Sequence, residues 1–214
     1  MSLIDNLIQE GWLKTAEIIE AFRRIKRVDF LPEDIKDLAE LNEALPIGYG
    51  QTISQPLVVA FMLEKLQPEP GDRILDVGAG SGWTSALLAE IVGKKGRIIA
   101  LEIVPELLEF GKKNVAKYNF REEGRCEFVC ADGSKGYQKE APFDKILVSA
   151  SAEVVSPSWK EQLKIGGRIV APIGSSIWLF VKKSLSFAKA TAGKAEEFEE
   201  IEYPGFAFVP LITK

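Results

Sequence analysis

Glycine and acidic residues form the sharpest local pattern in this sequence. The run from Asp76 through Gly78 and Gly80 to Gly82 directly follows an apolar segment of strand length and precedes a segment of helix length. Glycines at such a junction let the backbone turn tightly and approach a ligand at the carboxyl edge of a sheet. The pattern therefore predicts a ligand-binding loop between a strand and a helix.

The residue types in this loop distinguish two kinds of ligand. A dinucleotide fingerprint would place a third glycine at position 83, which is Trp83. The carboxylate of Asp76 would repel a pyrophosphate, whereas it helps to hold an amine or a sulfonium. The loop therefore favours S-adenosylmethionine (AdoMet) over a nicotinamide dinucleotide, and disfavours an NAD oxidoreductase.

Acidic residues also follow two further strand-like segments. Glu102 ends the next apolar segment, where a carboxylate can accept hydrogen bonds from both hydroxyls of a ribose. Asp132 and Gly133 follow the third segment, where the carboxylate can accept a hydrogen bond from an adenine amine. Because the carboxyl ends of parallel strands meet at one edge of a sheet, we expect these residues to complete a nucleoside site beside the glycine loop.

Histidine is absent from all 214 residues, and this absence limits the chemistry. It excludes Ser-His-Asp and Cys-His catalysis, histidine-ligated zinc and any imidazole general base. The two cysteines, Cys126 and Cys130, lie on one strand-like run, too far apart to form a disulfide or share a metal. We expect both to be buried apolar side chains and the protein to bind no metal.

Charge and hydropathy limit the partners and the compartment. The net charge of −4 provides no positive field for nucleic acid or an anionic membrane. The first residues lack the basic start and apolar core of a signal peptide, and prolines and glycines interrupt the uncharged stretch 44–63. We therefore expect a soluble, cytoplasmic, monomeric protein with no nucleic-acid or membrane partner.

The elements that must position these residues alternate between strands and helices. Near-continuous apolar strands are typical of a parallel sheet that is buried on both faces by helical crossovers. The expected strands are 73–77, 97–101, 127–130, 145–149 and 168–172, and the expected helices are 82–92, 105–118 and 157–164. The sequence thus predicts an α/β fold, a doubly wound and mostly parallel sheet with helices on both faces.

The flanking regions complete one expected domain, 1–214. The predicted parts are a helical extension at 1–45 with two or three short helices, a covered loop at 46–56, a helix from Leu57 to Leu66, a cofactor-binding core at 72–173, and a C-terminal region at 176–212. In that last region, 176–183 and 199–212 read as an antiparallel strand pair that closes the sheet. The segment 184–197 between them reads as a solvated hairpin connection.

Several motifs, in this order and spacing, resemble those of the protein-L-isoaspartate O-methyltransferases. They are LPIGYGQTISQP, LDVGAGSGW, ADGSKGY, EAPFDKILVSASA, EQLKIGGRIVAPIGS and FVPL. The resemblance runs from about Trp12 to Ile212. The glycine loop alone is generic to AdoMet-dependent methyltransferases, but GQTISQP together with the late FVPL is much more restrictive. The resemblance implies a Rossmann-like methyltransferase fold.

The resemblance also implies a reaction and a substrate class. The family transfers a methyl group from AdoMet to the free α-carboxylate of an isoaspartyl residue in a damaged protein, leaving S-adenosylhomocysteine. The ester closes to a succinimide that reopens partly to normal aspartate, so the family repairs many proteins. Such a carboxylate is already ionised at neutral pH and needs no base to attack a sulfonium methyl, which agrees with the absence of histidine.

Site residues carry over from the family position by position. The resemblance implies that Ser54 is the active-site serine, best interpreted as a hydrogen-bond donor to the acceptor carboxylate. It further implies Thr52, Ile53 and Gln55 along the cleft between cofactor and acceptor, Gly78, Gly80 and Gly82 at the methionine end, Glu102 at the ribose, Asp132 and Gly133 at the adenine, and Val209, Pro210 and Leu211 beside the isoaspartyl peptide. Ser54 can also have a structural role, as the cap before the helix that Pro56 helps to start, and this role is compatible with donating a hydrogen bond to the acceptor carboxylate.

Some departures and alternatives remain open at this stage. Leu57 stands where many relatives carry an aromatic residue or histidine, which puts one pocket contact in doubt, and 184–197 is longer than usual. A methyltransferase of the same fold acting on RNA or a small molecule is one alternative, although such an RNA enzyme usually shows a basic face. A non-catalytic AdoMet-binding module is another.

Overall fold

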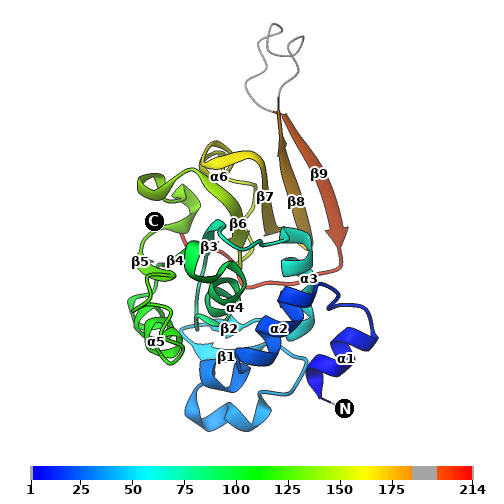
Figure 1. Ribbon diagram of the computed structural model, residues 1–214, viewed down its shortest axis with the longest axis vertical. Helices are drawn as coiled ribbons and strands as arrows, with labels where there is room; N and C mark the ends of the chain where they lie inside the picture. Colours follow the sequence, from blue (N-terminus) through cyan, green and yellow to red (C-terminus); the bar gives the residue numbers. More distant parts are fainter. Residues whose placement is uncertain (1, 185–196, 214) are drawn as a thin grey trace, which may run out of the picture.

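The computed structural model describes residues 2–184 and 197–213 and is built around a seven-stranded sheet (Figure 1). The strands are β3 (Arg73–Val77), β4 (Arg97–Glu102), β5 (Cys126–Cys130), β6 (Phe143–Val148), β7 (Leu163–Ile173), β8 (Ser176–Lys183) and β9 (Glu197–Pro204). They lie in the order β5-β4-β3-β6-β7-β8-β9, with β3 to β7 parallel and β8 and β9 antiparallel to their neighbours. The predicted mostly parallel sheet with a C-terminal antiparallel pair is confirmed.

Helices cover both faces of the sheet, but unequally. They are α1 (Leu3–Gln9), α2 (Ala16–Arg24), α3 (Pro56–Leu66), α4 (Trp83–Val92), α5 (Pro105–Ala116) and α6 (Pro157–Glu161). Buried side chains of α1 to α5 form one core with Ile74 of β3, whereas the opposite core contains Leu75 and Val77 of the same strand with Trp159 of α6. Among the residues that the structure describes, the second face therefore has one short helix, together with the 3₁₀ turns Gly133–Lys135 and Gln138–Glu140.

The N-terminal region matches the expected short helices and adds two 3₁₀ turns. These are Arg27–Phe30 and Glu33–Leu38, and they follow α1 and α2 along the chain. A third such turn, Gly93–Lys95, follows α4. The region packs its buried side chains, Phe30 among them, into the same core as α3 and α4, so it is continuous with the body of the fold.

The expected loop at 46–56 contains a small hairpin instead. Strand β1 (Leu45–Gly48) pairs antiparallel with β2 (Gln51–Ile53). The turn needs a left-handed backbone at three successive residues, with φ of +90° at Gly48, +55° at Tyr49 and +70° at Gly50. Two glycines supply that conformation without steric cost. The expectation of a covered segment was correct for Ile47 and Ile53, which are 5% and 3% exposed, and wrong at the turn, where Tyr49 is 61% exposed.

Two expected elements end earlier than the sequence indicated. The helix expected at 157–164 stops at Glu161, because the Gln162 carbonyl accepts from the Phe143 amide and Leu163 joins strand β7. The strand expected at 199–212 stops at Pro204, and Gly205 then turns the chain with a φ of +94°. The expected connection at 184–197 falls, except at its two ends, outside the described residues.

Two further observations concern the cysteines and the hydropathy of the helices. Cys126 is buried, and burial raises the pKa of its thiol, but Cys130 is exposed, so the expectation of a buried side chain was wrong there. The pleat places Cys130 on the same face as the buried Cys126 and Phe128, so its exposure comes from its place at the end of β5, an edge strand of the sheet. Within residues 2–184 and 197–213, no helix is long and apolar enough to span a membrane.

Candidate active site

The glycine loop connects β3 to α4 at the carboxyl edge of the sheet. Gly78, Gly80 and Gly82 have φ of +79°, +51° and +84°, a left-handed conformation that side chains rarely adopt. The amides of Gly78 and Ala79 donate to the Leu101 carbonyl at 2.9 and 3.0 Å, which ties the loop to the end of β4. The loop lies where the strand order reverses, between β4 on one side of β3 and β6 on the other. This is the position at which open α/β sheets bind ligands.

Gly82 lets the glycine loop pack closely against α5 and does not contribute to the ligand-facing surface of the loop. A Cβ at this residue would lie 2.9 Å from Cγ2 of Val115 and 3.0 Å from the carbonyl oxygen of Gly111, both on α5. Gly82 is the N-cap of α4 and does not line the cavity described below. The structure therefore brings Gly78 and Gly80, but not Gly82, to the wall of the candidate site.

Asp76 lies beneath the loop, completely buried. Its Oδ2 accepts a hydrogen bond of 2.6 Å from Ser85 of α4, and no hydrogen bond of normal geometry reaches Oδ1 among the described residues. The pKa of Asp76 is raised to about 6, chiefly by burial, with a further contribution from the charge of Glu102 and with the Ser85 and Ser149 hydroxyls opposing the shift. Asp76 lines neither the cavity nor the two clefts described below, so the structure does not place its side chain in direct contact with a ligand in those spaces.

Glu102 is the carboxylate that reaches the cavity, and backbone amides hold it. Its Oε2 accepts from the Gly80 amide at 2.8 Å, and Oε1 accepts from Ile103 at 2.8 Å and Val104 at 2.9 Å. These bonds fix the carboxylate against the glycine loop while leaving Oε2 with a further lone pair. The predicted acid at the end of this strand is thus fixed beside the predicted loop.

A cavity whose empty space of about 510 Å³ includes its open mouth lies above these residues. The lining residues are Gln51, Thr52, Val77, Gly78, Gly80, Leu101, Glu102, Ile103, Ala131, Gly133, Ser149, Ala150, Val209, Pro210, Leu211 and Ile212. Most of these side chains are apolar or small, and Glu102 is the one ionisable group among them. The arrangement is an apolar slot with a carboxylate at its wall, which suits a nucleoside base and ribose.

Asp132 and Gly133, which were predicted beside the adenine, follow β5 at the same edge of the sheet and differ in whether they reach the cavity. Gly133 lines the cavity, and a Cβ there would lie 2.4 Å from Cγ1 of Val77, so only glycine fits. Asp132 Oδ1 accepts from the Ser134 amide at 3.0 Å and hydroxyl at 2.6 Å, and Lys135 lies 3.3 Å from Oδ2. The Asp132 side chain itself is not part of the cavity wall.

Two clefts adjoin the cavity. One is lined by Ala44, Thr52, Ser54, Gln55, Val58, Ser149, Ala207, Phe208 and Val209, and the other by Thr52, Ile53, Ser54, Gly78, Ala79, Gly80, Ser81, Trp83, Thr84 and Ser149. We call the first the acceptor cleft, after the role that the family resemblance implies for Ser54. Thr52 and Ser149 line all three spaces, so these two residues stand where the cavity and the acceptor cleft meet.

Ser54 faces both clefts and is not the cap of the following helix. The N-cap of α3 is Gln55, which forms no side-chain capping bond. The Oδ1 of Asn42 instead accepts from the Leu57 amide at 3.0 Å, and the Gln55 side chain donates to the Asn42 carbonyl at 2.8 Å. No hydrogen bond to the Ser54 hydroxyl forms within the described part of the chain, which leaves it available to a ligand.

The C-terminal segment forms the remaining wall. After β9 it runs back to the carboxyl end of β6, where the Ser151 amide donates to the Val209 carbonyl and the Leu211 amide donates to the Ser151 carbonyl, both at 2.8 Å (Figure 1). The predicted residues Val209, Pro210 and Leu211 all line the cavity, and Val209 also lines the acceptor cleft. Leu57, whose effect on the pocket was in doubt, packs against the core and lines none of these spaces.

Sequence reasoning missed several lining residues. Ser149 and Ala150 directly follow β6 and reach the site for the same reason as Glu102 and Gly133, so their place at a strand end was a usable signal. Gln51 and Ala44 had no such signal, since the hairpin brings them to the site.

The charges of the site decide which ligand it fits. Among the described residues that line the cavity and the two clefts, there is no lysine or arginine. A pyrophosphate would therefore meet no cation, and it would meet the Glu102 carboxylate. A nucleoside with a positively charged substituent meets favourable charge and an apolar slot, so the residues present fit an adenosyl sulfonium.

Solved structures share this architecture. A protein-L-isoaspartate O-methyltransferase superposes with a TM-score of 0.84 at 26% identity, covering 97% of this chain and 64% of that chain. A Plasmodium falciparum protein described by the same activity, in complex with S-adenosyl-L-homocysteine, superposes with a TM-score of 0.82. It covers 99% of this chain and 97% of its own, and its 22% identity shows the fold alone. The fold and the site define a Rossmann-like methyltransferase.

Sequence comparison gives the particular family. The family model described as protein-L-isoaspartate(D-aspartate) O-methyltransferase matches residues 1–214. A protein-L-isoaspartate O-methyltransferase of Methanopyrus kandleri is 41% identical, covering 98% of this chain and 89% of its own length. Protein-L-isoaspartate O-methyltransferase 2 of Archaeoglobus fulgidus is 45% identical, covering 84% of this chain and 80% of its own. The chain belongs to the protein-L-isoaspartate(D-aspartate) O-methyltransferase family.

Proposed function

We propose that this chain methylates the free α-carboxylate of L-isoaspartyl residues in damaged proteins, with AdoMet as methyl donor and S-adenosylhomocysteine as product. The observation that carries the proposal is the junction of the apolar cavity and the acceptor cleft at Thr52 and Ser149. A transfer between two ligands needs two adjoining sites, and holding both reactants in one orientation supplies a large part of the rate. The family relationship supports this substrate class.

The residues around the cavity would hold the cofactor by shape and charge. Gly78 and Gly80 allow close approach of the backbone, Glu102 offers a lone pair to the ribose hydroxyls, and Gly133 leaves room beside the base. Asp76 and Gly82 act from behind the loop, Asp76 through its negative charge and Gly82 through packing on α5. When bound, AdoMet supplies a methyl group activated by a sulfonium.

The acceptor cleft would orient a carboxylate without removing a proton. The Ser54 hydroxyl can donate to the acceptor carboxylate, and Thr52 and Ser149 offer further hydroxyls at the junction. Val58 and Val209 close the apolar side of this cleft, and Gln55 donates to the Asn42 carbonyl. Ile53, which is 3% exposed, lines the adjoining cleft. Since the acceptor is already an anion near neutral pH, the work of these residues is positioning and exclusion of water.

The finer features of the protein are proposals on the same footing. The chain would act as a single domain, 1–214, and as a cytoplasmic monomer whose partners are proteins and peptides with exposed isoaspartyl residues. Neither nucleic acid nor a membrane would bind, since the net charge is −4. No metal is required, because the acceptor is already a nucleophile and the donor is already activated.

Paired peptides test this function. Two peptides that differ only in isoaspartate versus aspartate at one position are incubated with the protein and methyl-labelled AdoMet. We expect label in base-labile ester on the isoaspartyl peptide alone. Equal labelling of both peptides, or labelling of neither, would contradict the proposal, and binding of S-adenosylhomocysteine without any labelling would favour a binding module. Labelling of RNA instead would favour the other alternative.

Ser54 provides the matched variant for this assay. We expect Ser54→Ala to lower turnover of the isoaspartyl peptide by about tenfold, the effect of one lost hydrogen bond to a charged group. The affinity for S-adenosylhomocysteine should stay close to that of the wild type, because Ser54 does not line the nucleoside cavity. Ser149→Ala is the comparison at the junction. A collapse of cofactor affinity in Ser54→Ala would show that the residue serves the fold.

A further inference from the structure

Arg27 is a buried arginine to which neither the sequence pattern nor the proposed reaction assigns a part. It opens the first 3₁₀ turn of the N-terminal region and is 6% exposed. Burial lowers its pKa to about 10, and the charge of Glu40 opposes this shift, so the guanidinium stays charged at neutral pH. A buried charge needs compensating partners, yet no carboxylate in the described chain forms an ion pair with it.

The partners of Arg27 are backbone carbonyls from two separate segments. Nη1 donates to the carbonyls of Ala39 at 3.2 Å and Leu41 at 2.9 Å. Nη2 donates to the carbonyls of Glu43 at 2.7 Å and Ser54 at 3.3 Å. One rigid, planar group thus binds four carbonyls at once, which the fixed fork of arginine donors permits and a lysine ammonium does not.

The two segments joined in this way lie side by side at the acceptor cleft, because Ala44 and Ser54 directly flank the paired residues Leu45 and Ile53 of the β1–β2 hairpin. Residues 39–44 contain only turns and bends, so no regular hydrogen-bond ladder holds them in place. Ala44 and Ser54 both line the cleft. The guanidinium also lies 5.4 Å from the ring centre of Trp83, which lines the adjoining cleft.

We propose that Arg27 is a positioning residue for the acceptor, fixing the place of Ala44 and the direction of the Ser54 hydroxyl at the acceptor cleft. This inference rests on the proposed function, since it assumes that the acceptor binds against Ser54. Arg27 does not touch the acceptor. It acts through the Ser54 peptide, whose carbonyl it holds, and through the 39–44 segment, to which the Asn42 hydrogen bonds with Gln55 and Leu57 give further support.

The alternative is that Arg27 serves only the stability of the N-terminal region. The two roles differ in what they affect, because the nucleoside cavity shares only Thr52, Ser149 and Val209 with the acceptor cleft. A positioning role weakens the binding of the isoaspartyl peptide while leaving the affinity for S-adenosylhomocysteine unchanged. A purely structural role weakens both together or neither.

The variants are Arg27→Lys, which keeps the charge but not the fork, and Arg27→Met, which removes both. Arg168→Met is the matched control, since Arg168 also binds one carbonyl, that of Lys65 at 2.9 Å, but at the opposite end of α3. Three quantities are measured for each protein: the melting temperature, the dissociation constant of S-adenosylhomocysteine, and the dissociation constant of an isoaspartyl peptide at saturating S-adenosylhomocysteine. The last needs no turnover. We expect the peptide to bind Arg27→Lys about tenfold more weakly, a loss of about 1.4 kcal/mol, and Arg27→Met more weakly still.

A double-mutant cycle on kcat/KM shows whether Arg27 acts through Ser54. If it does, Ser54→Ala costs less in the Arg27→Lys protein than in the wild type, because the hydroxyl is already misplaced there. Additive losses, unchanged peptide affinity in both Arg27 variants, equal losses of peptide and S-adenosylhomocysteine, or failure of both variants to fold would each overturn the inference. A wild-type protein that binds S-adenosylhomocysteine but no isoaspartyl peptide would instead contradict the proposed function on which it rests.

Discussion

At the scale of single residues, two acids with similar positions in the sequence pattern, Asp76 and Glu102, have different places in the site. Asp76 and Glu102 both end parallel strands beside the glycine loop, yet only Glu102 reaches the cavity. Glu102 accepts three backbone amides, whereas Asp76 is buried with one hydroxyl on Oδ2. Such a buried, poorly partnered carboxylate costs stability when it ionises, and this cost is measurable.

The pH dependence of stability tests this account of Asp76. Its pKa is about 6 in the folded protein, against 3.8 as the ordinary value. Between those pH values the folded state holds more protons at this group than the unfolded state, so Asp76 lowers the free energy of unfolding as the pH rises. The penalty is fully present above pH 6 and absent below pH 4. A shift of about two units corresponds to roughly 3 kcal/mol.

Asp76→Asn should therefore gain stability relative to the wild type as the pH rises. We expect the difference in free energy of unfolding, variant minus wild type, to increase by roughly 2–3 kcal/mol between pH 4 and pH 7, measured by urea titration across that range. Ser85→Ala removes the hydrogen bond that lowers the pKa, so it should move the same transition to higher pH. Parallel stability curves for wild type and Asp76→Asn would contradict the assignment.

At the scale of elements, the position of the glycine loop depends on how closely α4 and α5 approach. Gly111 of α5 faces the loop, and a Cβ there would lie 2.8 Å from the carbonyl oxygen of Gly80 and 2.8 Å from the Phe128 ring. Neither contact can be accommodated without a shift, since one partner is backbone and the other a packed aromatic ring of β5. The same loop residue, Gly80, donates to Glu102.

Gly111→Ala should thus disturb the cofactor site from a distance. Alanine favours a helix over glycine by about 1 kcal/mol, so propensity alone predicts a more stable protein. We expect the opposite, a loss of about 1–3 kcal/mol from overpacking, together with weaker binding of S-adenosylhomocysteine in calorimetry. Lys113→Ala, at an exposed position on the same helix, is the control and should change neither quantity. A stabilised Gly111→Ala protein would show that the loop tolerates the displacement.

The elements also show what could be predicted from sequence and what could not. The strand Arg73–Val77 was predicted to the residue because it is buried on both faces and most of its residues are apolar. The β1–β2 hairpin was missed because its strands have four and three residues and its turn depends on a left-handed Tyr49. Asn42, which caps α3 in place of Ser54, lies in an irregular segment and becomes the cap only through tertiary contact.

The same distinction holds for the candidate site. Residues at strand ends were predictable because a parallel sheet collects its carboxyl ends at one edge, and Glu102 and Gly133 do line the cavity. The family motifs indicated Ser54 and Val209, which no periodicity would have brought together. Neither signal could reveal Arg27, since its partners are backbone atoms of residues 12 to 27 positions away.

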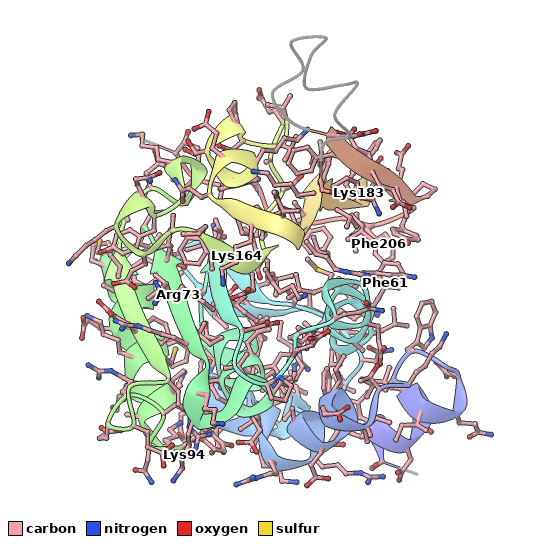
Figure 2. The ribbon with its side chains drawn as sticks, turned by 45° about the horizontal axis from the view of Figure 1, so that its top comes forward. Phe61, Arg73, Lys94, Lys164, Lys183 and Phe206 are labelled. Carbon is pink, nitrogen blue, oxygen red and sulfur yellow. The ribbon has the colours of Figure 1, made fainter. Side chains whose placement is uncertain are left out.

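At the scale of the whole molecule, an aromatic cluster connects three distant parts of the chain to the acceptor cleft. Phe61 of α3 lies 6.2 Å from Trp12, 5.1 Å from Tyr203 and 5.2 Å from Phe206, measured between ring centroids. Figure 2 shows Phe61 and Phe206 facing each other from α3 and the C-terminal segment. Directly after Phe206, residues 207–209 form one wall of the acceptor cleft.

The ring contacts of this cluster hold residues 207–209, which form that wall, in position. Strand β9 ends at Pro204, and the hydrogen bonds to Ser151 begin at Val209. Between these points the chain is fixed by the ring contacts and by two hydrogen bonds, from the Gly205 and Phe206 amides to the Ser175 carbonyl. Lys65 strengthens the cluster, with its ammonium 5.2 Å from the Phe61 ring centre and 4.6 Å from that of Tyr203. Loss of the central ring should therefore affect the cleft more than the cavity.

Phe61→Ala tests this connection between α3 and the C-terminal wall. We expect a loss of about 2–4 kcal/mol in the free energy of unfolding, as for other aromatic truncations, and a larger rise in KM for the isoaspartyl peptide than in the dissociation constant of S-adenosylhomocysteine. The reason is that the cavity keeps its β3, β4 and β5 walls, whereas the cleft loses the support of residues 207–209. Phe198→Ala is the matched control, because Phe198 lies on the same strand as Tyr203 but packs under Lys160, 4.8 Å from its ring centre, away from the site. If Phe198→Ala raised KM as much as Phe61→Ala, the effect would come from general loss of stability along β9, and the aromatic cluster would have no particular part in binding the acceptor.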